Sequence, residues 1–179
     1  MCNELARILR MDAVDRILEQ WRNVRPDLDS APIGVIGRLS RLSAIVDRRL
    51  AENIARHDLE AWMYDVLATL RRSGPPYELT AGELLEQSMV TTGAMTNRVD
   101  RLEQRGLVER SAVPGDRRKV MVRLTESGLE LVDQVVGGHL DTERELLQSL
   151  SSSQQATLAR LLRTALTGLG DHPPDRSTP

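Results

Sequence analysis

The segment 79–125 constrains the fold most, because its local signals define two successive helices followed by a hairpin. Thr80 and Glu83 have the spacing of a capping box, in which each side chain satisfies a backbone donor at a helix start. After a turn of small polar residues, 93–105 has the pattern of a second helix, and Gly106 suits the left-handed residue that ends it. The apolar positions of this second helix are Met95, Val99 and Leu102. The sequence therefore predicts a helix-turn-helix.

A hairpin with a basic tip is predicted directly after these helices. Two short apolar runs, 107–108 and 120–122, flank the segment 113–119, whose Pro-Gly pair and charged residues favour a turn. Between positions 98 and 123, eight basic residues stand against four acidic ones, a local balance of +4 in a chain whose net charge is −2. The basic residues are Arg98, Arg101, Arg105, Arg110, Arg117, Arg118, Lys119 and Arg123.

This order of elements is that of a winged helix-turn-helix, so the sequence predicts a mostly α fold with a small β-hairpin wing (α+β). A chain with a net negative charge does not attract phosphate through its overall field, so any affinity for nucleic acid has to come from the local basic patch. The alternative is a solvated charged hairpin without a partner. Because a capped helix pair precedes this hairpin, we expect it to bind double-stranded DNA.

Helices are also predicted on both sides of this segment, and we expect them to form a dimer layer. Trp62 lies on an apolar stripe of the helix before the segment, and Thr125 and Ser151 can cap the two helices after it. We predict one domain over 1–170, with N-terminal helices (12–56), a winged helix-turn-helix core (58–125) and C-terminal dimerisation helices (126–170). A disordered tail is expected at 171–179. In a two-fold homodimer the two recognition helices would lie about 34 Å apart, one turn of DNA. The alternative is that the terminal helices only close a monomeric core.

The sequence contains no pattern typical of an enzyme, a metal site or a membrane span, so we predict no catalytic role and no cofactor. Cys2 is the single cysteine, which excludes an internal disulfide framework and a cysteine-based zinc site. His57, His139 and His172 lack the spacing of metal ligands. No apolar run approaches the roughly 18 residues that span a bilayer, and the N-terminus lacks the apolar core of a signal peptide. We expect a cytoplasmic protein.

The same residues resemble the MarR family of bacterial transcriptional regulators. The resemblance is carried by 91–98, 101–110 and 116–118 and extends over nearly the whole chain. It implies a repressor that binds a pseudo-palindromic operator as a dimer. In that family the recognition helix lies in the major groove, and a wing arginine enters the minor groove, where negative potential is concentrated. The predicted DNA contacts are Thr92, Thr96, Asn97, Arg101, Asp116, Arg117, Arg118 and Lys119.

A narrower resemblance concerns the ligand. The urate-responsive, PecS-like branch of the family has a tryptophan on an N-terminal helix, an aspartate in the helix before the helix-turn-helix, and arginines on and after the recognition helix. The residues at the matching places here are Trp21, Asp65, Arg98 and Arg110. A planar anionic purine needs a ring to pack on, guanidinium groups for its charge and an acceptor for its N–H groups. The resemblance therefore implies that urate or a related purine is the effector.

Each of these four residues also has an ordinary structural explanation. Trp21 shares an apolar stripe that suits a core position, and Asp65 lies off its stripe, as a solvated residue does. Arg98 can form a local salt bridge, and Arg110 can contact a phosphate. A regulator with a phenolic or carboxylate effector needs the same wing and a different pocket. A thiol-based switch would depend on Cys2.

Overall fold

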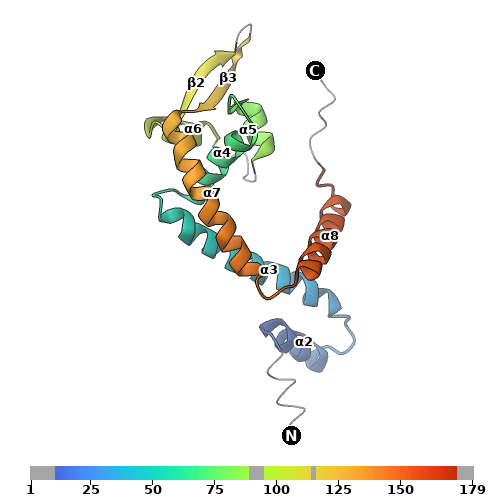
Figure 1. Cartoon of the computed structure of the whole chain (residues 1–179). Helices are drawn as coiled ribbons and strands as arrows, with labels where there is room; N and C mark the ends of the chain where they lie inside the picture. Colours follow the sequence, from blue (N-terminus) through green and yellow to red (C-terminus); the bar gives the residue numbers. More distant parts are fainter. Residues whose placement is uncertain (1–10, 89–94, 114–115, 173–179) are drawn as a thin grey trace. The chain divides into compact units, whose positions relative to one another are not determined.

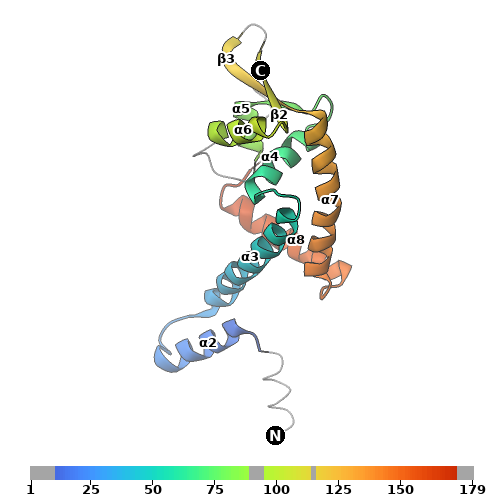
Figure 2. The same cartoon turned by 90° about the vertical axis from the view of Figure 1, so that its left-hand side faces the viewer.

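Helices dominate the chain, as the sequence predicts, and one small sheet accompanies them (Figures 1 and 2). The computed structural model describes residues 11–88, 95–113 and 116–172. The elements in chain order are α2 (Ala13–Val24), α3 (Ala31–Ala55), α4 (Ala61–Arg72), β1 (Glu78–Thr80), α5 (Ala81–Gln87), α6 (Met95–Gln104), β2 (Val108–Val113), β3 (Asp116–Leu124), α7 (Glu126–Leu147) and α8 (Ser152–Gly168). They divide into two compact units, 1–49 and 50–179. The predicted grouping of 1–170 into one domain stays a prediction.

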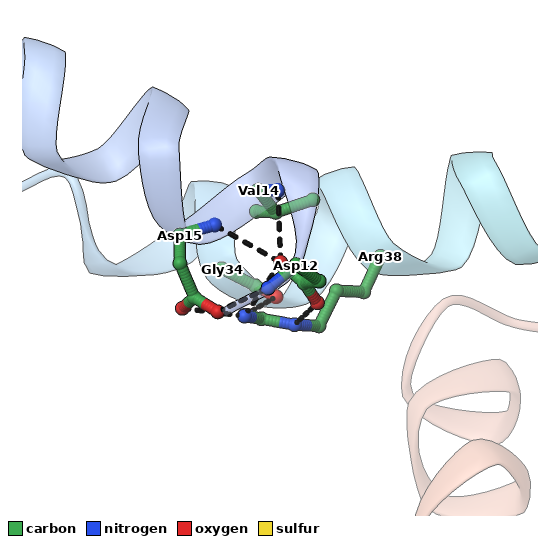
Figure 3. A network of polar contacts seen from close by, with 5 residues as sticks. All are labelled: Asp12, Val14, Asp15, Gly34 and Arg38. Atoms are coloured by element: carbon green, nitrogen blue, oxygen red, sulfur yellow. Dashed lines mark hydrogen bonds and ion pairs between the residues drawn. The ribbon is translucent and has the colours of Figure 1, made fainter. Parts of the chain in front are cut away.

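In the first unit, α2 packs on the beginning of α3 through one network of polar contacts (Figure 3). Asp12 caps α2 by accepting the backbone N–H groups of Val14 and Asp15. The Arg38 guanidinium of α3 donates to Asp12 over 2.7 Å and to Asp15 over 2.7 Å, and it holds the pKa of Asp12 below its usual value. Gly37 lets the helices approach, since a Cβ there would lie 3.3 Å from Val14.

The second unit contains the predicted helix-turn-helix and confirms its local signals. Thr80 caps α5 by accepting the N–H of Glu83, and the Glu83 carboxylate accepts the N–H of Thr80 over 2.8 Å. The Thr80 hydroxyl also donates to the Glu83 carboxylate over 2.7 Å, and this bond, followed by the one from the Thr80 N–H, lowers the pKa of Glu83. Gly106 adopts a left-handed φ of 67°, two residues after the last residue of α6. The turn that joins α5 to α6 lies partly in 89–94, outside the described residues.

The wing belongs to an antiparallel sheet with the strand order β1-β3-β2. The short strand β1 is an addition to the prediction, and it pairs Leu79 with Val122 of β3. The predicted turn over 113–119 is too long, because β2 extends to Val113 and β3 begins at Asp116. An antiparallel sheet can have one face in solvent, so charged residues are compatible with its strands. Only 114–115 lie between the strands, and they are outside the described residues.

The core of the second unit joins α4, α5, α6, the sheet and α7. Its fully buried side chains include Leu67, Leu70, Leu84, Leu102, Val66, Val99, Val108, Val122, Val132 and Val135. The predicted cap at Thr125 is confirmed, since its hydroxyl accepts from Gly128 and donates to the carbonyl of Gly106 over 2.6 Å. Gly128 comes so close to the wing that a Cβ would lie 2.0 Å from the carbonyl oxygen of Leu107. This close approach fixes the first turn of α7 at the end of the recognition segment.

The last two helices carry apolar side chains that the chain itself does not bury. α7 runs without interruption through Gly137 and Gly138, and the predicted cap at Ser151 starts α8 with a capping box. Exposed large apolar residues on these two helices are Leu140, Leu161, Leu162 and Leu166. No residue of α8 is buried. Within the described ranges, no helix combines the length and the apolar character needed to cross a membrane.

Gly128→Ala is expected to destabilise the protein by about 3 kcal/mol, because the added methyl group meets backbone that cannot move aside freely. The control is Gly137→Ala, at a position in the same helix where a Cβ meets nothing within 4 Å. That change is expected to stabilise by about 0.5–1 kcal/mol through helix propensity. Urea unfolding followed by circular dichroism measures both values. Equal stability of Gly128→Ala and the wild type would contradict the close approach.

Candidate nucleic-acid interface

Burial of one side of α6 decides which of its residues face outward. The buried residues are Met95, Val99 and Leu102, as predicted. Thr96, Asn97 and Arg101 are exposed. These three predicted DNA contacts are therefore accessible to a partner, and Thr92 lies outside the described residues. An α-helix with short polar side chains and an arginine on its open side suits the major groove, where such groups can contact base edges and phosphates.

The wing carries the other predicted DNA contacts. β2 and β3 project as a hairpin beyond α5 and α6 in both views (Figures 1 and 2). Asp116, Arg117 and Arg118 are the first residues of β3, at the far end of the hairpin. Lys119 follows them, and its side chain is exposed. A projecting hairpin beside an exposed helix allows contact with two grooves at once.

Ion pairs offset part of the positive charge that the sequence places in this segment. The Arg101 guanidinium pairs with Glu60, which stands 41 residues earlier in the chain. Arg123 pairs with Glu109 over 2.7 Å and approaches Glu78 at 4.0 Å, and the contact with Glu109 raises the pKa of Arg123. Glu60 and Glu78 lie outside the segment that was counted. The local charge is therefore less positive than the predicted balance of +4.

Arg110 ties the wing to the recognition helix. Its guanidinium donates to the Asp100 carboxylate over 2.5 Å and to the backbone carbonyl of Thr96 over 3.0 Å. Its backbone N–H donates to Glu103 over 3.2 Å. Three acceptors on α6 thus hold the first part of β2. This arrangement fixes the distance between the helix and the hairpin, which have to fit two adjacent grooves together.

Arg98 and Arg101 face α4, where both contact the same aromatic ring. The guanidinium carbon of Arg98 lies 5.7 Å from the Trp62 ring centroid, and that of Arg101 lies 4.9 Å away. The indole N–H of Trp62 donates to Glu60 over 2.7 Å, and this bond, followed by the one from Arg101, lowers the pKa of Glu60. The Nη1 atom of Arg98 is buried and has no hydrogen-bond partner among the described residues.

The predicted ligand residues do not all come together in one chain. Arg110 contacts the side of α6 that carries Thr96 and Asp100. At 3.6 residues per turn, Arg98 lies about 160° around the helix from Asp100, where it contacts Trp62 of α4. The helix therefore separates the two arginines that the resemblance assigns to one ligand.

The other two predicted ligand residues lie on α2 and α4. Trp21 belongs to the first unit, and 43% of its surface is exposed, so the chain's own core does not bury it. Asp65 is half-buried on α4, and its backbone carbonyl accepts a hydrogen bond from Thr69 over 2.7 Å. Asp65 shares the second unit with Arg98 and Arg110.

A small apolar pocket lies on the Arg110 side of α6. Its volume is about 120 Å³, comparable with cavities of about 150 Å³ that hold a single benzene ring. The lining residues are Ala81, Met95, Thr96, Val99, Arg110, Val120 and Val122. The pocket thus combines apolar walls with one guanidinium. No group of three or more His, Cys, Asp or Glu side chains in the described ranges is arranged to hold a metal ion.

Sequence reasoning assigned Trp62 to an apolar stripe and did not single out Glu60. Trp62 does pack partly against the core, so that assignment is correct but incomplete. The signal that could have been used is Glu60 at the N-cap position, two residues before an aromatic ring. Nothing in the local pattern indicates that α6 supplies the partner of this carboxylate.

Comparison with known proteins identifies one family. The MarR family model matches residues 62–120. The transcriptional regulator PecS of Dickeya dadantii is 42% identical over 149 residues, which are 83% of this chain and 90% of PecS. A mutant of MarR from Escherichia coli, solved with operator DNA, matches with a TM-score of 0.66 and 31% identity over 82% of this chain and 97% of that one.

A further solved structure concerns a regulator with a known effector. BpsR of Bordetella bronchiseptica, whose DNA binding is regulated by 6-hydroxynicotinic acid, matches with a TM-score of 0.66 and 25% identity. The match covers 73% of this chain and 91% of BpsR. The proteins matched here are transcription regulators and not enzymes, which confirms the predicted fold and the predicted class of protein.

Arg110→Lys is expected to weaken binding to promoter DNA roughly fivefold, the equivalent of about one net hydrogen bond. A single ammonium group cannot reproduce the planar fork that serves Asp100 and the Thr96 carbonyl together. The control is Arg123→Lys, because Arg123 pairs with Glu109 on the neighbouring strand and does not bridge to α6. Gel-shift titrations at fixed salt measure both affinities. Equal losses in the two variants would show that the bridge to α6 has no special role.

Proposed function

Because this chain belongs to the MarR family of DNA-binding transcriptional regulators, we propose that it represses transcription as a homodimer on a pseudo-palindromic operator. We also propose that a small planar anion such as urate, or a related purine, releases it from DNA. The observation that carries the DNA-binding mode is the exposed surface of α6 beside the projecting β2–β3 hairpin. The proposed setting is the bacterial cytoplasm, where such operators lie.

Exposed apolar side chains at both ends of the chain support the homodimer. On α3 these are Val35, Ile36, Leu39, Leu42 and Ile45, and on α8 they are Leu161, Leu162 and Leu166. Ile36 is 61% exposed and Leu161 is 54% exposed. Apolar surface of this extent on helices usually marks an interface between proteins. A second copy of the chain is the partner that would also give a two-fold operator its matching half-sites.

In the proposed complex, α6 occupies the major groove and the wing reaches the minor groove. Thr96, Asn97 and Arg101 contact base edges or phosphates in the major groove. Arg117 and Arg118 of the wing are the candidates for the minor groove, where a narrow width strengthens the negative potential. Thr92, Asp116 and Lys119 complete the proposed set of contacts.

The buried Nη1 of Arg98 supports an anionic effector. A guanidinium group that donates no hydrogen bond at a buried nitrogen leaves a donor unsatisfied, at a cost of about 1–3 kcal/mol. An oxygen of a planar anion such as urate would satisfy it. The proposed site is centred on Arg98. The resemblance to the urate-responsive branch implies that Asp65, Trp21 and Arg110 also take part, and Arg110, which lies on the other side of α6, would act through that helix. The relationship to PecS, at 42% identity, supports the same branch.

One observation favours a second candidate effector. The pocket beside Arg110 has apolar walls and a guanidinium, the combination that suits an aromatic carboxylate. BpsR is regulated by 6-hydroxynicotinic acid, a compound of this kind. A phenolic or carboxylate metabolite is therefore the alternative ligand, bound on the Arg110 side of α6. A thiol-based switch at Cys2 is the remaining alternative, and Cys2 lies outside the described residues.

DNA binding is expected to weaken steeply with salt. If a dimer neutralises six to eight phosphates, log K falls with log salt at a slope of about −5 to −7. The DNA is the region upstream of the chain's own gene, and the measurement is fluorescence anisotropy between 50 and 200 mM salt, conditions in which the effect is large. Sedimentation of the complex is expected to give two chains per operator. A flat salt profile, or one chain per operator, would reject the proposed mode.

Urate is expected to weaken DNA binding about 5- to 150-fold, the usual range of effector coupling. Arg98→Ala and Trp21→Ala are expected to lose most of that release. The control is Arg25→Ala, since Arg25 is exposed and pairs with its neighbour Asp27 over 2.6 Å. The measurement is the ratio of the two DNA dissociation constants, with and without urate.

The same ratio distinguishes the alternative effectors. Release by 6-hydroxynicotinate and not by urate, with sensitivity to Arg110→Ala, would favour the pocket on the Arg110 side. Unchanged urate release in both Arg98→Ala and Trp21→Ala would remove those residues from the site. Release by hydrogen peroxide that is lost in Cys2→Ser would favour the thiol switch, since Cys2→Ser is expected to have no effect on a ligand-responsive regulator.

A further inference from the structure

Two arginines of the recognition helix share one indole ring. Arg98 and Arg101 are three residues apart on α6, so their side chains are neighbours, and the guanidinium carbons lie 5.7 and 4.9 Å from the Trp62 ring centroid. A guanidinium group over an indole ring gains cation–π attraction. Both arginines are therefore attracted to the same small region and repel each other within it.

The two arginines differ in how their charge is balanced. Arg101 pairs with Glu60, and Glu60 is itself held by the indole N–H of Trp62 over 2.7 Å. The Nη1 atom of Arg98 is buried and has no hydrogen-bond partner among the described residues. Arg101 thus has a carboxylate partner, whereas Arg98 has one buried N–H donor without an acceptor. A carboxylate or enolate oxygen is the group that this donor lacks.

We propose that Trp62 couples the effector to DNA, by linking the anion-binding Arg98 to the DNA-contacting Arg101. This inference rests on the proposed function, since it takes Arg98 as a ligand residue and Arg101 as a DNA contact. Trp62 is a positioning residue in this scheme. Its ring positions Arg98 with one N–H donor unpaired. Together with Glu60, it also binds the Arg101 guanidinium and so competes with DNA phosphate for that group.

The direction of the effect follows from the charges. An anion bound to Arg98 neutralises that guanidinium and removes its repulsion of Arg101. Arg101 then binds more firmly to Trp62 and Glu60 and is withdrawn from DNA. Conversely, when a DNA phosphate binds Arg101, Arg98 alone contacts the Trp62 ring. Arg98 then binds the ring more firmly, and its affinity for the anion falls. The two effects must be equal in size, because coupling between two binding sites is reciprocal.

The test compares Trp62→Leu, Trp62→Phe and Glu60→Gln with the wild type. Operator affinity is measured by fluorescence anisotropy with and without urate, and urate affinity is measured by calorimetry without DNA. Trp62→Leu removes the ring and is expected to lower the release ratio from the wild-type range to less than ~2-fold. Trp62→Phe keeps a weaker ring face and is expected to retain part of the release. Glu60→Gln is expected to tighten the ligand-free DNA complex about two- to fivefold.

A matched control separates coupling from stability. Tyr77→Leu removes another cation–π contact of the second unit, where the Arg71 guanidinium carbon lies 4.9 Å from the ring centroid. It is expected to leave the release ratio unchanged even where it lowers the melting temperature. Melting temperatures of all variants are recorded beside the affinities. Glu60→Gln is nearly isosteric and Trp62→Phe keeps an aromatic ring at the same position, so these two variants decide the question if Trp62→Leu does not fold.

Three outcomes are distinguishable. Loss of release in Trp62→Leu, partial release in Trp62→Phe and tighter DNA binding by Glu60→Gln support the coupling. Normal urate release by Trp62→Leu overturns the role of Trp62 and leaves the proposed function in place. If Trp62→Leu does not fold, normal release by Trp62→Phe together with an unchanged DNA affinity of Glu60→Gln has the same meaning. Absence of release in the wild type overturns urate as the effector, and the coupling with it.

Discussion

The rotation of α6 about its own axis is the constraint on which the rest of the site depends. Burial of three apolar side chains sets it, each worth about 1.5–3 kcal/mol; they are Met95, Val99 and Leu102. A turn of the helix by one residue would expose them. With this rotation fixed, Arg98 and Arg101 must face α4, Asp100 must face the wing, and Asn97 must face solvent. The chemistry of each side of the helix is therefore a consequence of packing on a single stripe.

Local signals predicted the backbone well, because they act within a few residues. Hydroxyl caps at Thr80, Thr125 and Ser151 begin their helices as predicted, and Gly106 ends α6 with a positive φ. The hydroxyl of a cap hydrogen-bonds to backbone only two or three positions away, so the sequence contains both partners. The same holds for the stripe of α6. Fold class and recognition helix could thus be predicted without tertiary information.

The composition of the site could not be predicted in the same way, because its partners are distant in sequence. Glu60 and Arg101 are 41 positions apart, and no periodicity relates them. The strand β1 is three residues long and exists because β3 offers it a ladder. Arg98 and Arg110 seemed equivalent as two guanidinium groups, but the packing of the wing places Arg110 on the far side of α6. Which side an arginine takes depends on the neighbour that packs there.

Because Arg101 already pairs with Glu60, its contribution to DNA affinity comes from an exchange of one ion-pair partner for another. When a phosphate replaces Glu60 as the partner of Arg101, the gain is the difference between two ion pairs, which is smaller than the energy of the phosphate pair alone. An affinity set by such an exchange responds to any change at the intramolecular partner, including one too small to move a helix. An arginine without an intramolecular partner would bind phosphate more strongly. An effector could not then weaken DNA binding by strengthening an intramolecular ion pair. A recognition helix whose arginines already have partners is therefore suited to regulation by a small charge brought nearby.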